Sequence, residues 1–125
     1  MILDTNALAA YLDRTPEAAA IVSEAREIAT PVIVAGEFAF GIAQSRHREA
    51  YERSLHRMLD RCFVLDIGIE VARHYAAIRL ELKAAGKPIP ANDVWIAALS
   101  RQHAMPVMSR DSYFDFVGGL RRRTW

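Results

Sequence analysis

The chain has 125 residues, the usual length of one domain, so we expect a single domain spanning residues 1–125. Its hydrophobic fraction of 52% and charged fraction of 25% are ordinary for a folded globular protein and argue against disorder. The net charge of +1 provides no global field for a polyanionic partner, and the single cysteine, Cys62, excludes an internal disulfide and a multi-cysteine zinc site.

The chain opens with an apolar run, residues 1–3, that passes directly into Asp4. An apolar run without alternation is typical of a short strand covered on both faces. Asp4 then stands at the carboxyl end of this strand, where open parallel sheets have their ligand sites. Either Thr5 or Asn6 is expected to cap a short helix that ends near residues 13–14.

A second helix and a second strand follow. Pro16 after Thr15 is typical of a helix start, and this helix is expected to run to about Glu27. The apolar run at residues 32–34 predicts a second buried strand. Glu37 would then lie in the first turn of a helix that begins just past that strand.

The middle of the chain predicts two helices around one strand. Residues 46–61 are charged with a helical pattern, and Glu49 and Arg53 are spaced to pair four residues apart. Residues 62–65 predict a third strand, and residues 69–85 form a long amphipathic pattern. We interpret the arginines of the charged helix as a solvated face.

The last third of the chain contains two further acids near strand and helix ends. Two prolines fix an extended loop, Asn92 is expected to cap an apolar helix, and Asp93 falls in its first turn. Residues 106–108 predict a fourth strand, and Asp111 follows its end. A glycine pair then turns the chain toward a short edge strand within residues 120–125.

Strands that alternate with helices predict an α/β fold with a parallel sheet covered on both faces. In such a sheet the carboxyl ends of the strands meet at one edge. Four acids are expected there: Asp4, Glu37, Asp93 and Asp111. Carboxylates gathered in one pocket repel one another unless a cation lies among them, and a hard divalent ion such as Mg²⁺ prefers oxygen ligands. The pattern therefore predicts a metal site.

Taken singly, each acid also has a simpler explanation. Acids such as Glu37 and Asp93 are common in the first turn of a helix, and Asp111 after Ser109 could form a turn. Asp115 is a weaker fifth candidate. The four histidines lack metal-like spacing, and glycine-rich phosphate loops and a nucleophile elbow are absent. The prediction therefore depends on the four acids occurring together.

Four segments in order resemble the PIN-domain ribonucleases and, more narrowly, VapC, the toxin of bacterial type II toxin–antitoxin pairs. They are ILDTN at residues 2–6, PVIVAGE at 31–37, PIPANDVWIAA at 88–98 and SRD at 109–111. The resemblance extends over essentially the whole chain, to the ending at Trp125.

The resemblance implies a three-layer α/β/α sandwich with a mainly parallel sheet, and Mg²⁺- or Mn²⁺-dependent cleavage of RNA. It also implies a homodimer and a VapB-type antitoxin that occupies the acidic pocket. The family's metal-coordinating acids match Asp4, Glu37, Asp93 and Asp111. Thr5 and Asn6 match residues that support the first acid, and Ser109 matches a small hydroxyl residue near the site. Water activated at the metal would attack the phosphodiester, with no covalent nucleophile.

Other functions remain open at this stage. A signalling receiver domain has a similar length and an acidic metal pocket, a noncatalytic module could use the acids for docking, and a housekeeping PIN nuclease could process RNA. Arg110 and the basic tail Arg121–Arg123 could contact RNA or serve only the surface. The first residues lack a signal-peptide pattern and no apolar run is long enough to span a bilayer, so we expect a cytoplasmic protein without a membrane partner.

Overall fold

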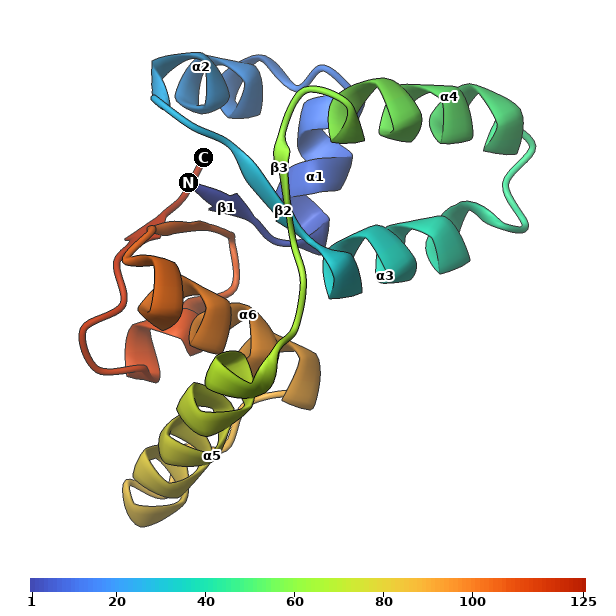
Figure 1. Ribbon diagram of the computed structural model, residues 1–125. Coiled ribbons are helices and arrows are strands. Elements are labelled where there is room, and N and C mark those ends of the chain that lie inside the picture. The colour runs from blue at the N-terminus through green and yellow to red at the C-terminus, as the bar shows by residue number, and fades with distance from the viewer.

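The computed structural model describes all 125 residues and contains one central sheet (Figure 1). Its five strands are all parallel, in the order β3-β2-β1-β4-β5. The strands are β1 (Ile2–Leu3), β2 (Ala29–Pro31), β3 (Phe63–Leu65), β4 (Val107–Met108) and β5 (Arg122–Arg123). The predicted α/β fold with a parallel sheet is confirmed, and so is the short edge strand at the end of the chain.

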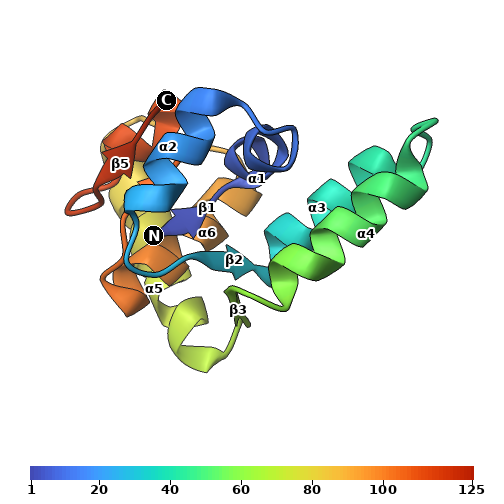
Figure 2. The same ribbon diagram turned by 90° about the horizontal axis from the view of Figure 1, so that it is seen from above.

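Helices cover both faces of this sheet. They are α1 (Thr5–Leu12), α2 (Pro16–Glu24), α3 (Val32–Ile42), α4 (Arg48–Leu59), α5 (Ile69–Ala84), α6 (Ala91–His103) and the 3-10 helix η1 (Ser112–Phe116). Helices α1 and α2 lie on one side of the sheet and the α5–α6 pair lies on the other, which gives the three-layer arrangement (Figures 1 and 2). Helices α3 and α4 project side by side from the body (Figure 2).

The core lies between the sheet and these helices and contains 26 buried hydrophobic residues. Strands β1 and β4 at the centre of the sheet are completely buried, as expected for short apolar strands covered on both faces. Helix α6 buries an almost continuous run from Val94 to Ser100. The two central strands and α6 therefore form a rigid frame, and all three carry predicted acids at or near their ends.

The second strand differs from the sequence prediction. Residues 32–34 are not a strand but the first turn of α3, while β2 lies at Ala29–Pro31. Val34, Phe38 and Ile42 are buried at a spacing of four, so their stripe follows the helical period rather than the strand period. Pro31 is the last residue of β2, and its ring nitrogen carries no N–H that could donate to the sheet. Glu37 consequently lies in the second turn of α3.

Helix caps also differ from the predictions. Asp4 itself caps α1, in place of Thr5 or Asn6, and α6 begins at Ala91, so that Asn92 lies inside it. Helix α2 ends at Glu24, because the backbone of Ala25 is already extended. The charged helix, the third strand and the long helix lie within a few residues of their predicted ranges.

The structure contains no helix that combines the length and the apolarity needed to cross a membrane.

Candidate active site

The four predicted acids line one cavity of about 610 Å³. The cavity lies where β1 and β4, which are neighbours in the sheet, reach their carboxyl ends, and where α3 and α6 approach them. Its lining comprises Asp4, Thr5, Asn6, Glu37, Phe40, Pro90, Ala91, Asn92, Asp93 and Asp111. Asp4, Glu37, Asp93 and Asp111 thus face the same space from four separate parts of the chain.

Asp4 is the most buried of the four acids, with 4% of its surface exposed. Its Oδ1 accepts a hydrogen bond of 2.6 Å from the backbone N–H of Ala7, so the carboxylate is held by the first turn of α1. Burial raises the pKa of Asp4, the nearby charge of Asp111 adds to this effect, and hydrogen bonds from Ser109 and Ala7 oppose it. Asp4 is therefore a fixed acid whose negative charge is costly in the absence of a cation.

Both oxygens of Glu37 are held by donors from other helices. The hydroxyl of Thr5 on α1 donates to Oε2, and the amide Nδ2 of Asn92 on α6 donates to Oε1 at 2.5 Å. These two bonds fix the orientation of the carboxylate and connect three helices at the cavity. Thr5 thus contacts Glu37, whereas the family resemblance implies that it supports Asp4.

Asp93 lies in the first turn of α6, as predicted, and its carboxylate has neither a hydrogen-bond donor nor an ion-pair partner. Burial raises the pKa of Asp93 to about 6, and the charges of Asp111, Asp4 and Glu37 contribute in that order. Asp93 therefore lies close enough to the other three carboxylates to be repelled by their charges. A cation among them would relieve this repulsion.

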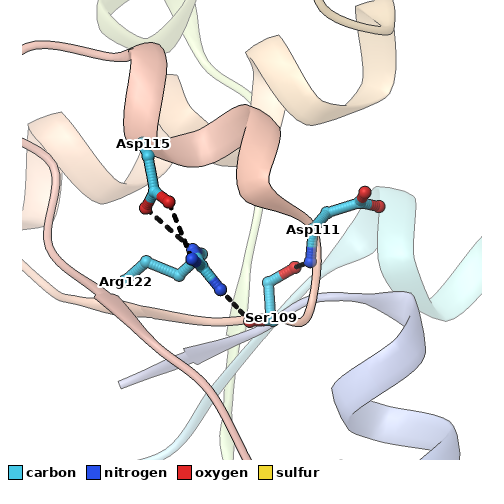
Figure 3. A network of polar contacts seen from close by, with 4 residues as sticks. All are labelled: Ser109, Asp111, Asp115 and Arg122. Carbon is cyan, nitrogen blue, oxygen red and sulfur yellow. Dashed lines mark hydrogen bonds and ion pairs between the residues drawn. The ribbon is translucent and has the colours of Figure 1, made fainter.

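Asp111 follows β4 and precedes η1. Its backbone N–H donates to Oγ of the buried Ser109 at 2.8 Å, and its carboxylate points away from the neighbouring Asp115 and Arg122 (Figure 3). Nη1 of Arg122 donates to the carbonyl oxygen of Ser109 at 3.2 Å. The segment that carries Asp111 is therefore anchored at both the hydroxyl and the carbonyl of Ser109.

Asp115, the weaker fifth candidate, does not line the cavity. Its two carboxylate oxygens accept bonds of 2.8 and 2.7 Å from Nε and Nη2 of Arg122 (Figure 3). These bonds lower the pKa of Asp115. Because the pair connects η1 to β5, Asp115 holds the end of the sheet in place next to the site.

Three other residues singled out in the sequence lie outside the cavity. Arg110 is exposed and its guanidinium lies 4.7 Å from the centre of the Trp125 ring. Arg123 pairs weakly with Glu24 at 3.6 Å, and Arg121 is exposed. None of these arginines forms an ion pair with a site acid.

The donor set fits a hard divalent cation in chemistry. Every charged residue of the cavity lining is a carboxylate, and none of the six ion pairs of the chain involves one of the four acids. No three acidic, histidine or cysteine side chains are already close enough to form a complete ligand set. An open acidic site that takes further ligands from water and phosphate matches the behaviour of Mg²⁺ better than a closed protein cage does.

Two features of the site were missed in the sequence. The sequence predicts Asn92 only as a helix cap, although its amide holds Glu37, and nothing in the sequence singles out Phe40. Asn92 lies next to Asp93, so its place beside the cavity could have been inferred from that neighbour. The exposure of Phe40 depends on how α3 packs, and no feature of the neighbouring sequence indicates it.

Comparison with known proteins places this chain in a family. The PIN domain family matches residues 1–120. The chain is 30% identical over 129 aligned positions to "Ribonuclease VapC2" of Haemophilus influenzae, an alignment that covers 99% of this chain and 96% of the relative.

Solved structures share this fold. DNA-bound VapBC from Salmonella typhimurium superposes with a TM-score of 0.87 at 24% identity, covering 99% of this chain and 96% of the other. A member of the VapBC family of toxin–antitoxin systems from Mycobacterium tuberculosis has a TM-score of 0.75 at 26% identity, covering 98% of this chain and 94% of the other. The chain belongs to the PIN domain family, among the relatives of the VapC ribonucleases.

Proposed function

We propose that this chain is a VapC-type endoribonuclease, the toxin of a type II toxin–antitoxin module, and that it hydrolyses RNA phosphodiesters with Mg²⁺ or Mn²⁺. The observation that supports this most is the meeting of Asp4, Glu37, Asp93 and Asp111 in one cavity of a PIN domain. The name of the Haemophilus influenzae relative, a ribonuclease, agrees with that chemistry.

In this proposal the four carboxylates would hold the ion, and the hydrogen bonds that orient these carboxylates would determine where it binds. Asp4 is fixed by the first turn of α1, and Glu37 by Thr5 and Asn92. Burial and the charges of the other three acids raise the pKa of Asp93, and a bound cation would offset that repulsion. When bound, such an ion activates water and stabilises charge on the phosphate and the leaving oxygen. The lining contains no histidine, lysine, cysteine or tyrosine for acid–base or nucleophilic work.

The proposed partner is a VapB-type antitoxin, and the proposed assembly contains a homodimer of this chain. The related structures described as VapBC contain toxin and antitoxin together. An acidic cavity without a cation of its own is complementary to a basic side chain of such a partner. A basic residue of the antitoxin placed there would exclude both the metal ion and the RNA.

The strand order argues against the receiver-domain alternative. In receiver-type sheets β1 lies between β2 and β3. Here β1 lies between β2 and β4, and neither lysine of the chain lines the cavity. A noncatalytic docking module and a housekeeping nuclease use the same fold, and the experiment below separates the first of them from the proposal.

The test is cleavage of total cellular RNA by the antitoxin-free protein with Mg²⁺, Mn²⁺ or a chelator. We expect cleavage with either metal, none with the chelator, and loss of cleavage in Asp93→Asn. Asp60→Asn is the matched control, because Asp60 is an exposed acid at the end of α4. Intact RNA under every metal would refute the nuclease function and favour the docking module. Dependence of cell growth on a gene for the antitoxin would favour the toxin over the housekeeping nuclease.

A further inference from the structure

Phe40 is an exposed aromatic residue at the acid cavity. Its side chain is 85% exposed, the largest value among the exposed large hydrophobic residues of the chain. It lies on α3 three positions after Glu37, a spacing that places two residues on one face of a helix. Phe40 also lines the cavity with the four acids, and it is the single aromatic residue of the lining.

Packing within the chain does not explain this phenylalanine. The apolar stripe of α3 that faces the core consists of Val34, Phe38 and Ile42, all of them buried. Phe38 packs edge-on against Tyr51, whereas Phe40 has no aromatic or cationic neighbour. A phenyl ring left in water at the rim of a polar cavity indicates a contact with something outside the chain.

The charge of the cavity limits what that contact can be. A polyanion usually gains affinity from lysine and arginine contacts with its phosphates. None of the ten residues of the lining is a lysine or an arginine. The side chains of the cavity can therefore offer a nucleic acid the hydroxyl of Thr5, the amides of Asn6 and Asn92, an ion that the acids would hold, and the face of Phe40. Stacking of a base on an aromatic ring is worth roughly 1–3 kcal/mol per base.

We propose that Phe40 stacks on an unpaired RNA base next to the cleaved phosphodiester and thereby determines which RNA this site accepts. The inference rests on the proposed ribonuclease function and adds to it a residue that determines specificity by contact with an unpaired base. A base inside a duplex is already stacked on its neighbours and does not offer its face to Phe40. The cavity volume of about 610 Å³ lies within the range of sites that enclose a small ligand, so there is room for a nucleotide.

The binding test uses the Asp93→Asn background, so that the RNA stays intact. The probes are a short fluorescently labelled single-stranded RNA of mixed sequence and the same strand annealed to its complement, measured by fluorescence anisotropy at low and high salt. The variants are Phe40→Ala, Phe40→Leu and Phe40→Trp. Phe63→Ala is the matched control, because Phe63 is 60% exposed but lies on β3, two strands away from β1, and outside the cavity.

We expect Phe40→Ala to raise the dissociation constant for the single-stranded probe roughly 5- to 150-fold. The same fold-change is expected at both salt concentrations, because stacking is not an ionic contact. Phe40→Trp should retain parental affinity, Phe40→Leu should behave like Phe40→Ala, and Phe63→Ala should change nothing. The duplex probe should bind weakly to all variants. Folding should be preserved, since substitutions of exposed residues usually change stability by about 0.5 kcal/mol or less.

Two results would overturn the inference. The first is parental affinity in Phe40→Leu or Phe40→Ala, which would exclude stacking. The second is a change of the oligomeric state in Phe40→Ala, measured by sedimentation without RNA, which would assign Phe40 to a contact between copies of this chain. Cleavage of total RNA by the parent separates these failures from failure of the proposed function. If the parent cuts RNA and Phe40→Ala binds it equally well, the inference fails alone.

Discussion

Replacement of Asp93 by asparagine is expected to stabilise the metal-free protein while it abolishes activity. The ionised carboxylate of Asp93 lies partly buried among three other acids, and its pKa is raised to about 6 from the ordinary 3.8. A carboxyl group whose pKa is higher in the folded state binds its proton more tightly there. Its ionisation therefore destabilises the fold, and this penalty appears as the pH rises from about 4 to about 6 and persists above that range. Asparagine has nearly the same shape and no charge.

The size of the effect follows from the two pKa values. Their difference corresponds to about 3 kcal/mol at 1.36 kcal/mol per pH unit. Asp93 is only partly buried, so screening by solvent reduces the expected gain to about 1–2 kcal/mol in Asp93→Asn at neutral pH. Little gain is expected near pH 4, where the carboxyl group of the parent is protonated in the folded state.

Urea unfolding in the presence of a chelator measures this gain at about pH 7.5 and at about pH 4. Asp60→Asn is the control, since this acid is exposed, and its free energy of unfolding should follow that of the parent at both pH values. An Asp93→Asn protein that is no more stable than the parent at neutral pH would refute the argument. Equal gains at both pH values would refute it as well, because the cause would then not be the charge.

Three further predictions concern the ion and the residues that position the acids. Saturating Mn²⁺, at about 100 times its dissociation constant, should stabilise the parent by about 2.7 kcal/mol in thermal unfolding and should stabilise Asp93→Asn much less. Arg122→Gln should break the pair with Asp115 and reduce the free energy of unfolding, measured in urea, by about 1 kcal/mol. It should also reduce cleavage by more than this loss of stability explains, and an unchanged kcat would contradict a positioning role. Thr5→Val should leave one oxygen of Glu37 without its donor and reduce cleavage about tenfold at unchanged fold, as judged by circular dichroism; parental cleavage would show that this bond is dispensable.

The sequence predicted those parts of the fold that depend on local pattern. The run before Asp4 is unbroken and apolar, α5 has an apolar stripe at helical spacing, and α6 is apolar over most of its length; the structure confirms all three elements. The prediction of a strand at residues 32–34 is wrong because a short run of valine and isoleucine is compatible with both strand and helix. There the decisive signal was the spacing of the buried residues further along α3.

The candidate site was predictable because of topology. Acids that follow parallel strands or open the next helix meet at one sheet edge, so the cavity that contains Asp4, Glu37, Asp93 and Asp111 could be anticipated from the order of the elements alone. The supports could not be anticipated in this way. The bond from Asn92 to Glu37 joins residues 55 positions apart on two helices, and the pairing of Arg122 with Asp115 requires the neighbouring position of β5 beside β4. Such contacts depend on tertiary packing.

The central claim is that the four carboxylates form one site for a divalent ion. The most direct measurement is isothermal titration calorimetry of Mn²⁺ into the chelator-stripped, RNA-free protein, with the parent beside Glu37→Gln, Asp93→Asn and Asp111→Asn, and with Asp60→Asn as the control. We predict saturable binding in the parent and in the control, and binding at least about tenfold weaker in each of the three site variants. Equal Mn²⁺ affinity in all five proteins, or no binding to the parent, would contradict the claim.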